Sequence, residues 1–349
     1  MSSIAVVGAG VIGLSSAVSI LEKDPTVKVT LIADKFSPYT TSDGAAGLIM
    51  PFVMGSTPVQ LQRKWFDETM KGLEELMKRK DAGQSLGLYK LTLVSLSDDE
   101  NAEEPHWKDL VDGYHVLTQK ELQKFPQSSK FGFSCRVMFL NGKYYNPWLL
   151  ERFKHLGGDI IKKTLDSLKE LSGVYDVVVN CSGMRAKELV NDFSMDPVRG
   201  QVLRVYAPWI KEAYAQDTKH LHKQERYCYI LPQANGEVVL GGTGYHHNSD
   251  TRISADDTRH ILEVTRELVP SLARAPVLEA WVGLRPGRPT VRLEKEVMKF
   301  NSNLGNKKTL KVVHNYGHGG GGLTVHWGCA KDCTDLVLQF LAEGHKAKL

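Results

Sequence analysis

The chain opens on Ile4-Ala-Val-Val7, which runs directly into Gly8-Ala-Gly10-Val-Ile-Gly13, and a second apolar run ends at Asp34. This order predicts a strand, a tight turn, a helix and a second strand. The three glycines would permit the turn, the approach of a pyrophosphate and close helix packing, in that order. The helix N-terminus attracts a diphosphate, and Asp34 can accept hydrogen bonds from a ribose diol. The stretch therefore predicts a bound dinucleotide, either FAD or NAD; the alternative is a glycine turn in a sheet without a ligand.

Length and composition indicate two domains and small-molecule chemistry. A chain of 349 residues exceeds one typical core, and its 42% hydrophobic content suffices for two. The 44 basic and 40 acidic side chains give a net charge of +4 without long runs of one sign, so a nucleic-acid footprint is not indicated. No apolar stretch approaches the roughly 18 residues that a membrane span needs.

The cysteines indicate neither a disulfide framework nor a structural zinc site, because their number is odd and Cys-x-x-Cys spacing is absent. We therefore expect reduced thiols in an intracellular protein. The five cysteines are Cys135, Cys181, Cys228, Cys329 and Cys333.

Two further apolar runs end in small residues, at positions 175–183 and 310–324. Such strand ends collect ligands at the carboxyl edge of a parallel sheet. Other segments alternate between turns and predict an antiparallel sheet, the candidate substrate domain. These segments are 198–209, 227–231 and 237–242.

Helical patterns and caps predict further helices, one of which closes the chain with an apolar face from Ala330 to Leu341. Apolar residues recur at helical spacing over 63–79. Asn146-Pro147 predicts a helix to about Gly157, with asparagine as N-cap and proline at the first helical position. Ser254 predicts a capped helix to about Leu268.

The last glycine-rich stretch carries a family resemblance. Val312-Val-His314-Asn-Tyr-Gly317-His-Gly-Gly-Gly-Gly322, followed by Gly328-Cys-Ala330, resembles the signature of the D-amino-acid oxidase and D-aspartate oxidase family. The similarity covers nearly the whole chain. Further matching motifs stand in the family's order at 6–13, 34–36, 40–41, 45–47, 179–183, 199–201, 240–242 and 283–286.

The resemblance implies an α/β fold with a Rossmann-like domain that binds FAD non-covalently. It also implies a second, largely antiparallel-sheet substrate domain, the two being interleaved in sequence. The FAD-binding domain is expected to comprise residues 1–49, 146–195 and 290–345. The substrate domain is expected to comprise residues 50–145 and 196–289, and residues 346–349 a C-terminal targeting tail.

The expected FAD-binding residues lie at strand ends and in small-residue loops. Amides of the final glycine loop could approach a flavin ring closely, and the dipole of the following helix would stabilise negative charge there. The predicted cofactor-binding residues are Gly8, Ala9, Gly10, Val11, Ile12, Gly13, Asp34, Lys35, Thr40, Thr41, Ser42, Gly47, Leu48, Thr164, Ser182, Gly183, Gly319, Gly320, Gly321, Gly322, Leu323 and Thr324.

Arg285 is the best candidate for a bidentate grip on a substrate carboxylate, because its guanidinium fork matches that geometry and stays charged. The family places its carboxylate-binding arginine there. By the same resemblance Tyr229 supports this carboxylate, the carbonyl of Gly320 accepts from the substrate amine, and Phe52 lines the substrate site. The predicted catalytic residues are therefore Tyr229, Arg285 and Gly320, although spacing alone gives equal weight to Tyr229 as a packed strand aromatic.

None of these motifs contains an obvious general base. This fits hydride transfer from the Cα of a neutral amine to the flavin, with the protein supplying orientation and electrostatics. His314 and His318 lack partners at metal-ligand spacing, so we expect structural or flavin-adjacent roles and no metal. Arg288 and Arg292 are expected to form ion pairs.

The resemblance implies oxidation of D-amino acids to 2-oxo acids, ammonia and hydrogen peroxide, with oxygen as electron acceptor. One alternative is another enzyme on the same scaffold, such as an L- or N-methyl-amino-acid oxidase or a flavin-linked dehydrogenase. The other is a non-catalytic nucleotide-binding module, against which the intact Arg285 and glycine loop argue.

One position favours neutral substrates. The D-aspartate oxidase branch carries an arginine directly after its Gly-Gly-Thr motif, where this sequence has Gly244. An unpaired side-chain carboxylate in an apolar cavity is costly, so we expect neutral D-amino acids, with D-aspartate and D-glutamate as the alternative. The second lid tyrosine of D-amino-acid oxidases is also missing, with Glu225 at its spacing. Cations that could approach from another direction are Lys223, Arg226, His246 and His247.

The sequence ends in Ala347-Lys348-Leu349, which is similar to the Ser-Lys-Leu address that the peroxisomal import receptor reads. We therefore expect a peroxisomal protein with that receptor as partner; the alternative is a solvated basic tail. The other expected partners are a D-amino acid, oxygen and a second copy of the chain as a homodimer. Neither nucleic acid nor a membrane is expected.

Overall fold

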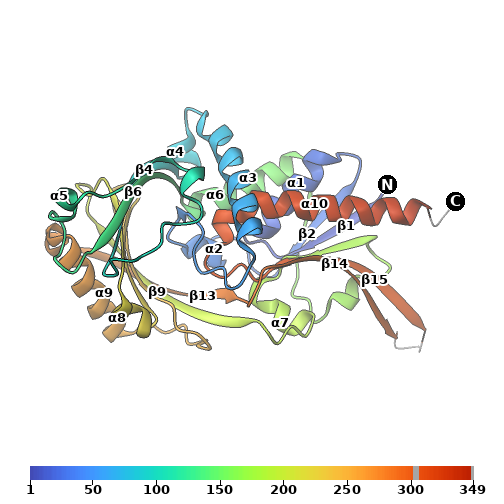
Figure 1. The fold of residues 1–349 in the computed structure, drawn as a ribbon. Helices are drawn as coiled ribbons and strands as arrows, with labels where there is room; N and C mark the ends of the chain where they lie inside the picture. Colours follow the sequence, from blue (N-terminus) through green and yellow to red (C-terminus); the bar gives the residue numbers. More distant parts are fainter. Residues whose placement is uncertain (302–305, 347–349) are drawn as a thin grey trace.

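The computed structural model describes residues 1–301 and 306–346, which form two sheets at opposite ends of an elongated molecule (Figure 1). The first sheet has six strands in the order β14-β15-β8-β1-β2-β7. All neighbours are parallel except β14 and β15. Its strands are β1 Ser3–Val7, β2 Lys28–Ala33, β7 Asp159–Lys162, β8 Val177–Asn180, β14 Arg292–Asn301 and β15 Lys307–Tyr316.

The second sheet has nine strands in the order β13-β9-β12-β11-β10-β4-β6-β3, with β5 also paired to β6. The predicted antiparallel arrangement of β9, β12 and β11 is confirmed, whereas β10 and β4 are parallel. β3 lies at the end of residues 1–49, the first range expected for the FAD-binding domain, but it pairs with β6 in this second sheet. Its strands are β3 Leu48–Ile49, β4 Leu88–Ser97, β5 Asp112–Val116, β6 Phe131–Leu140, β9 Asp196–Tyr206, β10 Ala213–Asp217, β11 Arg226–Pro232, β12 Glu237–Thr243 and β13 Val277–Gly287.

Helices cover the two sheets and the space between them (Figure 1). The α-helices are α1 Val11–Lys23, α2 Thr41–Gly44, α3 Val59–Met77, α4 Ala82–Ser85, α5 Gln119–Leu122, α6 Gly142–His155, α7 Ala186–Leu189, α8 Lys219–Lys223, α9 Ala255–Leu268 and α10 Gly322–Lys346. Short 3-10 helices are η1 Lys108–Leu110, η2 Leu168–Leu171, η3 Gly183–Arg185 and η4 Pro270–Arg274.

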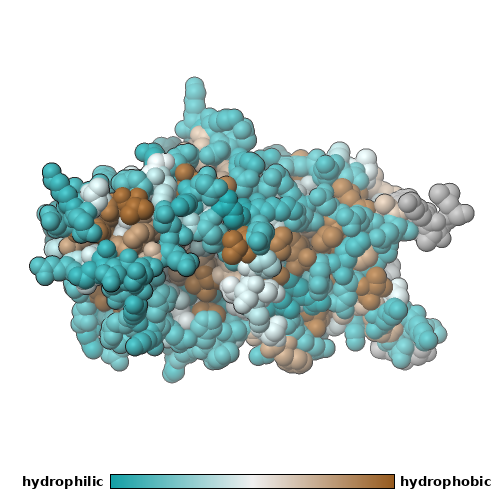
Figure 2. Space-filling view, in the orientation of Figure 1, coloured by the Kyte–Doolittle hydropathy of each residue, from teal (hydrophilic) through white to brown (hydrophobic). Residues whose placement is uncertain are grey.

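The central strands of the first sheet are buried on both faces, as expected for a parallel sheet between helices. α10 packs along α1 and α3, which joins the last helix of the chain to the first. The visible surface is mostly hydrophilic with scattered apolar patches (Figure 2). All five cysteines are buried, and none of them forms a disulfide, which agrees with the expected reduced thiols. Among the described residues no helix is long and apolar enough to cross a bilayer.

The predicted start of the helix at Asn146 is wrong. α6 begins at Gly142, and the side chain of Asn141 caps it by accepting from the N–H of Lys143 at 3.0 Å. Pro147 lies inside this helix. Asn146 is buried and donates to the carboxylate of Asp43 at 3.0 Å, so this asparagine serves a tertiary contact instead of a cap.

A buried aromatic cluster anchors the start of α10. His326 Nδ1 lies 2.7 Å from the carbonyl of Leu323 and therefore donates to it. His326 Nε2 then accepts from the hydroxyl of Tyr145 at 3.0 Å, and this hydroxyl accepts from Trp327 Nε1 at 2.9 Å. Burial lowers the pKa of His326 to about 4, so the ring is neutral at neutral pH.

This cluster predicts a histidine-dependent loss of stability in acid. The folded pKa of His326 lies below the ordinary value near 6.5, so the unfolded chain takes up the proton first as the pH falls. The free energy of unfolding should fall between about pH 6.5 and 4, by up to about 1.4 kcal/mol per pH unit for this group. Burial lowers the pKa values of His314 and His318 in the same direction.

His326→Gln should therefore make the stability of the protein less dependent on pH between pH 7 and 5, measured by urea unfolding. His155→Gln is the control, because His155 is exposed. An unchanged slope in His326→Gln would show that this histidine does not carry the acid sensitivity.

Candidate active site

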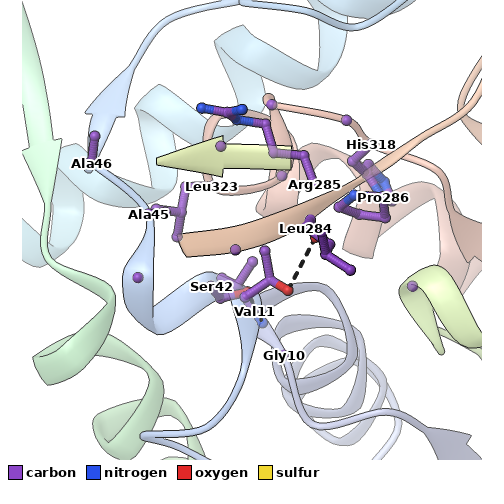
Figure 3. A pocket seen from close by; sticks show the side chains of 18 of the residues that line it. Gly10, Val11, Ser42, Ala45, Ala46, Leu284, Arg285, Pro286, His318 and Leu323 are labelled. Atoms are coloured by element: carbon purple, nitrogen blue, oxygen red, sulfur yellow. Dashed lines mark hydrogen bonds between the residues drawn. The ribbon is translucent and has the colours of Figure 1, made fainter. Parts of the chain in front are cut away.

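A cavity of about 590 Å³ is lined by residues of both sheets. The carboxyl ends of β1, β2 and β8 and the loop before α10 form one side, and β9, β11 and β13 form the other. Figure 3 shows Gly10, Val11 and Ser42 on one side of the β13 segment that carries Leu284, Arg285 and Pro286. The site is thus built from chain segments far apart in sequence.

The first glycine turn has the geometry that its sequence predicts. Gly8 has φ +110, and a Cβ there would overlap the carbonyl of Cys181. A Cβ at Gly13 would overlap the carbonyl of Gly8, so Gly13 lets α1 pack closely and does not itself line the cavity. The N-cap residue of α1 is Gly10, which has no side chain to accept from the first N–H groups of the helix, and the first turn contains no acidic residue. Its dipole therefore opens towards the cavity as a site for a diphosphate.

Asp34 follows β2 and faces Arg185, which the sequence did not suggest as part of the site. The closest oxygen and nitrogen of the pair are 3.7 Å apart, and both side chains are more than a third exposed. A solvated pair at this distance contributes little stability. The acceptor oxygens of Asp34 are therefore accessible to a ribose diol, as predicted.

A buried carboxylate shapes the loop around α2. Asp43 is 2% exposed and accepts from Ser37 Oγ at 2.6 Å and Asn146 Nδ2 at 3.0 Å. It also accepts from the N–H of Thr40 at 2.9 Å and its hydroxyl at 2.6 Å. These four donors fix the segment that presents Ser42, whose hydroxyl accepts from the N–H of Val11 at 3.1 Å.

The glycine loop uses its amides differently from the prediction. The N–H groups of Gly319, Gly320 and Gly321 donate to the carbonyls of Pro286, Val53 and His318, at 2.9, 3.1 and 2.9 Å. These three amides are therefore committed to holding the loop. The next amides, at 322–324, have no hydrogen-bond partner among the described residues and stand at the N-terminus of α10. The positive helix end, more than the loop itself, offers donors to a ligand.

Planar side chains of the second sheet lie flat on glycines. A Cβ at Gly200 would overlap the guanidinium of Arg285, and one at Gly241 would overlap the ring of Tyr229. Arg285 Nη1 donates to the carbonyl of Thr243 at 2.8 Å, which fixes the orientation of the guanidinium. Such close approach of side chain to backbone is possible only over glycine.

Tyr229 lies beside Arg285, as the predicted carboxylate site requires. Burial raises the pKa of Tyr229, and the neighbouring charge of Arg285 opposes this only in part. The phenol is therefore a neutral hydrogen-bond donor at neutral pH. Tyr229 lines the cavity, so it is not merely an aromatic side chain packed in a hydrophobic core.

Tyr227 is a cavity residue that the sequence reasoning missed. It lies two residues before Tyr229 on β11, and both tyrosines line the cavity. The thiol of Cys228, between them, donates to the carbonyl of Val264 on α9. The Phe52 ring meets the Tyr227 ring edge-on, with centroids 5.2 Å apart. The period of two along a strand was the signal that could have identified Tyr227.

Most predicted site residues line this one cavity. Those that line it are Gly8, Ala9, Gly10, Val11, Ile12, Asp34, Lys35, Thr40, Thr41, Ser42, Gly47, Leu48, Phe52, Ser182, Gly183, Tyr229, Arg285, Gly319, Gly320, Gly322 and Leu323. Gly321 packs on Met54, and the hydroxyl of Thr324 donates to the carbonyl of Met50 at 2.9 Å. Thr164 is exposed beyond the end of β7. The cavity does not include Gly13, Gly321, Thr324 or Thr164.

The remaining candidates make structural contacts. His314 is buried between Asn180 and Glu296, at 3.2 and 2.9 Å. Arg288 pairs with Asp192, and Arg292 with Glu294 and Glu296, which confirms their assignment to ion pairs. The described residues contain no group of three or more potential metal ligands.

Comparisons with known proteins identify the family. The profile of the family described as "FAD dependent oxidoreductase" matches residues 3–336. A relative named D-amino acid oxidase from Dugesia ryukyuensis is 39% identical over 348 residues, with 99% of each chain covered. A relative named D-aspartate oxidase from Homo sapiens is 41% identical, with 96% of this chain and 94% of that relative covered.

Solved structures share the fold at low identity. Glycine oxidase from Bacillus cereus superimposes with a TM-score of 0.73 at 19% identity, over 97% of this chain and 95% of that one. L-alpha-glycerophosphate oxidase from Mycoplasma pneumoniae, solved with FAD bound, also gives 0.73, at 16% identity, over 97% of this chain and 95% of that one. The residues of the cavity fit FAD, because the positive N-terminal ends of α1 and α10 and the accessible acceptor oxygens of Asp34 border one continuous space.

Asp43→Asn should weaken the binding of FAD, because the amide presents N–H groups to at least one of the four donors that now meet the carboxylate. An unsatisfied buried donor costs about 1 to 3 kcal/mol, which corresponds to a dissociation constant raised roughly 5- to 150-fold if the loop distorts. The measurement is titration of the apoprotein with FAD. Asp67→Asn is the control, because Asp67 pairs with Lys71 on exposed helix surface. Unchanged FAD affinity with a lowered melting temperature would limit Asp43 to a role in stability.

Proposed function

The chain belongs to the FAD dependent oxidoreductase family, and from this premise we propose that it is a D-amino-acid oxidase. It would convert D-amino acids to 2-oxo acids, ammonia and hydrogen peroxide. The observation that carries the proposal is the position of Arg285 and Tyr229 in the same cavity as the dinucleotide-binding turn. Relatives named D-amino acid oxidase at 39%, 32% and 35% identity support it.

The side chains on β11 and β13 would bind and orient the substrate. Arg285 offers the guanidinium nitrogens not used by Thr243 to the carboxylate, and Tyr229 adds a neutral donor. The carbonyl of Gly320 would accept from the amine, which fixes the Cα between these groups. When bound, FAD supplies the acceptor for the hydride of Cα and passes the electrons to oxygen.

No side chain beside Arg285 acts as a base in this scheme. Burial raises the pKa values of both Tyr227 and Tyr229, so neither phenol accepts a proton at neutral pH. The substrate amine would therefore lose its proton to water before the Cα–H bond breaks. The contribution of the chain is orientation and the charge of Arg285.

We favour neutral substrates because the cations near the site are already paired. His246 and His247 both contact Asp196, at 2.6 and 3.0 Å, and neither they nor Lys223 line the cavity. Arg226 lines it but donates to the hydroxyl of Tyr245 at 3.0 Å. It also lies 3.5 Å from Asp257.

Negative charge at the same end of the cavity disfavours a second substrate carboxylate. Burial is the main cause of the raised pKa of Tyr227; the charge of Arg285 lowers it, and the smaller effects of the carboxylates of Glu225 and Asp217 raise it. D-Aspartate would bring a like charge towards them. The similarity to the relative named D-aspartate oxidase is the reason why acidic D-amino acids are the second candidate substrates.

Arg285→Ala should lower kcat/KM for D-amino acids while FAD remains bound. Removing one partner of a desolvated charge pair typically costs about 2 to 5 kcal/mol, a factor of roughly 30 to several thousand. Tyr229→Phe should cost less, about 0.5 to 1.5 kcal/mol, because it removes one neutral hydrogen bond. Arg259→Ala is the control on an exposed helix face. Steady-state oxygen consumption measures all three, and full activity in Arg285→Ala would exclude this residue from the site.

The wild-type protein should prefer D-alanine or D-methionine to D-aspartate in kcat/KM at neutral pH. A preference of more than about tenfold for D-aspartate, equivalent to about 1.4 kcal/mol, would contradict the neutral assignment. In that event Arg226→Ala should remove the acidic activity selectively, because Arg226 is the one of the four alternative cations in the cavity wall.

We also propose a peroxisomal location, with the import receptor as partner. The proposal rests on Ala347-Lys348-Leu349, which lie outside the described residues, and on their similarity to a Ser-Lys-Leu address. Deletion of these residues should change a punctate distribution in cells to a diffuse one, whereas Ala347→Ser should keep it punctate. Punctate staining of the deletion variant would contradict the proposal. The homodimer stays a prediction, which light scattering of the purified protein would test.

A further inference from the structure

Tyr227 occupies a place that only a glycine neighbour allows. A Cβ at Gly244 would lie 2.5 Å from Cε2 of Tyr227 and 2.8 Å from its hydroxyl, so the ring rests directly on the backbone of Gly244. The N–H of Gly244 in turn donates to the carbonyl of Glu225 at 2.7 Å. The turn before β11 and the end of β12 together fix the position of this ring.

Phe52 connects Tyr227 to the glycine loop. Its ring meets Tyr227 edge-on at 5.2 Å, and its Cδ1 lies 3.2 Å from where a Cβ would stand on Gly320. The ring of His222 meets the Tyr227 ring at 6.2 Å, edge-on, from α8. The paired and exposed His222 and Asp217 line the same cavity, and the Tyr227 ring stands between the rings of Phe52 and His222.

We propose that Tyr227, held on Gly244, is a specificity-determining residue that narrows the side-chain end of the substrate site. This inference rests on the proposed function, which puts the substrate carboxylate at Arg285. A substrate held there has its side chain beside Phe52 and Tyr227, whose ring surfaces favour apolar groups. The ring also limits how large such a group can be.

The first test compares D-alanine and D-phenylalanine as substrates of the wild-type protein and of two variants at position 227. Tyr227→Ala should raise the ratio of kcat/KM for D-phenylalanine to that for D-alanine at least tenfold, because the wall is removed. Tyr227→Phe should change this ratio less than threefold, because the ring is kept. An unchanged ratio in Tyr227→Ala would overturn the proposal.

Gly244 provides a second, independent measurement. Gly244→Ala should lower kcat/KM for D-methionine at least tenfold, because the added Cβ displaces the ring. In the Tyr227→Ala background the same substitution should cost less than threefold. An equal fall in kcat/KM in the two backgrounds would contradict the claim that Gly244 acts by holding the Tyr227 ring. Gly83→Ala is the control, because a Cβ there meets nothing nearer than 4.0 Å.

Carboxylate binding separates a failure of this inference from a failure of the proposed function. A wild-type protein that holds FAD but oxidises no D-amino acid would contradict the function. The ratio of the dissociation constants of 3-phenylpropionate and propionate, measured by calorimetry, still tests whether the Tyr227 ring limits the size of the ligand, because binding does not require catalysis. Tyr227→Ala should shift that ratio at least tenfold in favour of 3-phenylpropionate, and an unshifted ratio would overturn the role of Tyr227.

Discussion

The close packing of planar side chains on glycine backbone is the constraint on which this site depends. Trp281 lies on Gly283 of its own strand and on Gly44 of α2, and a Cβ at either glycine would overlap its indole. The indole therefore connects the nine-stranded sheet to the loop that Asp43 holds. Arg285 follows four residues later on the same strand, so the position of the guanidinium is fixed relative to the cofactor side of the cavity. A strand presents alternate residues on one face, and that is why Trp281, Gly283 and Arg285 act together.

The sequence predicted the backbone features of the site better than its side-chain contacts. The turn at Gly8 and Gly13, the burial of β8 and the antiparallel segments followed from local patterns that any chain with this fold must satisfy. Three of the four donors to Asp43 come from Ser37 and Thr40 nearby in sequence, and the Thr40–Asp43 capping box is a local signal that the sequence reasoning missed. The contact with Asn146 on α6 could not be recognised, because it spans 103 residues. Asn146 was misread for the same reason: an asparagine before proline resembles a cap, and only the tertiary contact shows its use.

The glycine loop shows where resemblance and structure differ. The sequence predicts that its amides face a flavin, and the run of glycines suits that role. Three of these amides instead hold the loop against Val53, Pro286 and His318. The donors that remain belong to the first turn of α10, where a helix leaves its N–H groups without partners. The hydrogen-bonded cluster of Tyr145, His326 and Trp327 anchors this same turn, so the buried histidine helps to hold the free N–H groups in place.

Burial has the same effect on acids and bases around the cavity: it removes their charge. The pKa of Tyr229 is raised and that of His318 is lowered to about 3, so both are neutral at neutral pH. A guanidinium stays charged in proteins, unlike a phenol or an imidazole. In the proposed scheme the guanidinium of Arg285 would therefore attract the anionic group of the substrate. In the proposed scheme neither the neutral phenol of Tyr229 nor the carbonyl of Gly320 would hold an ammonium ion by opposite charge. The neutral amine would be the reacting form, because its nitrogen lone pair allows a hydride to leave Cα.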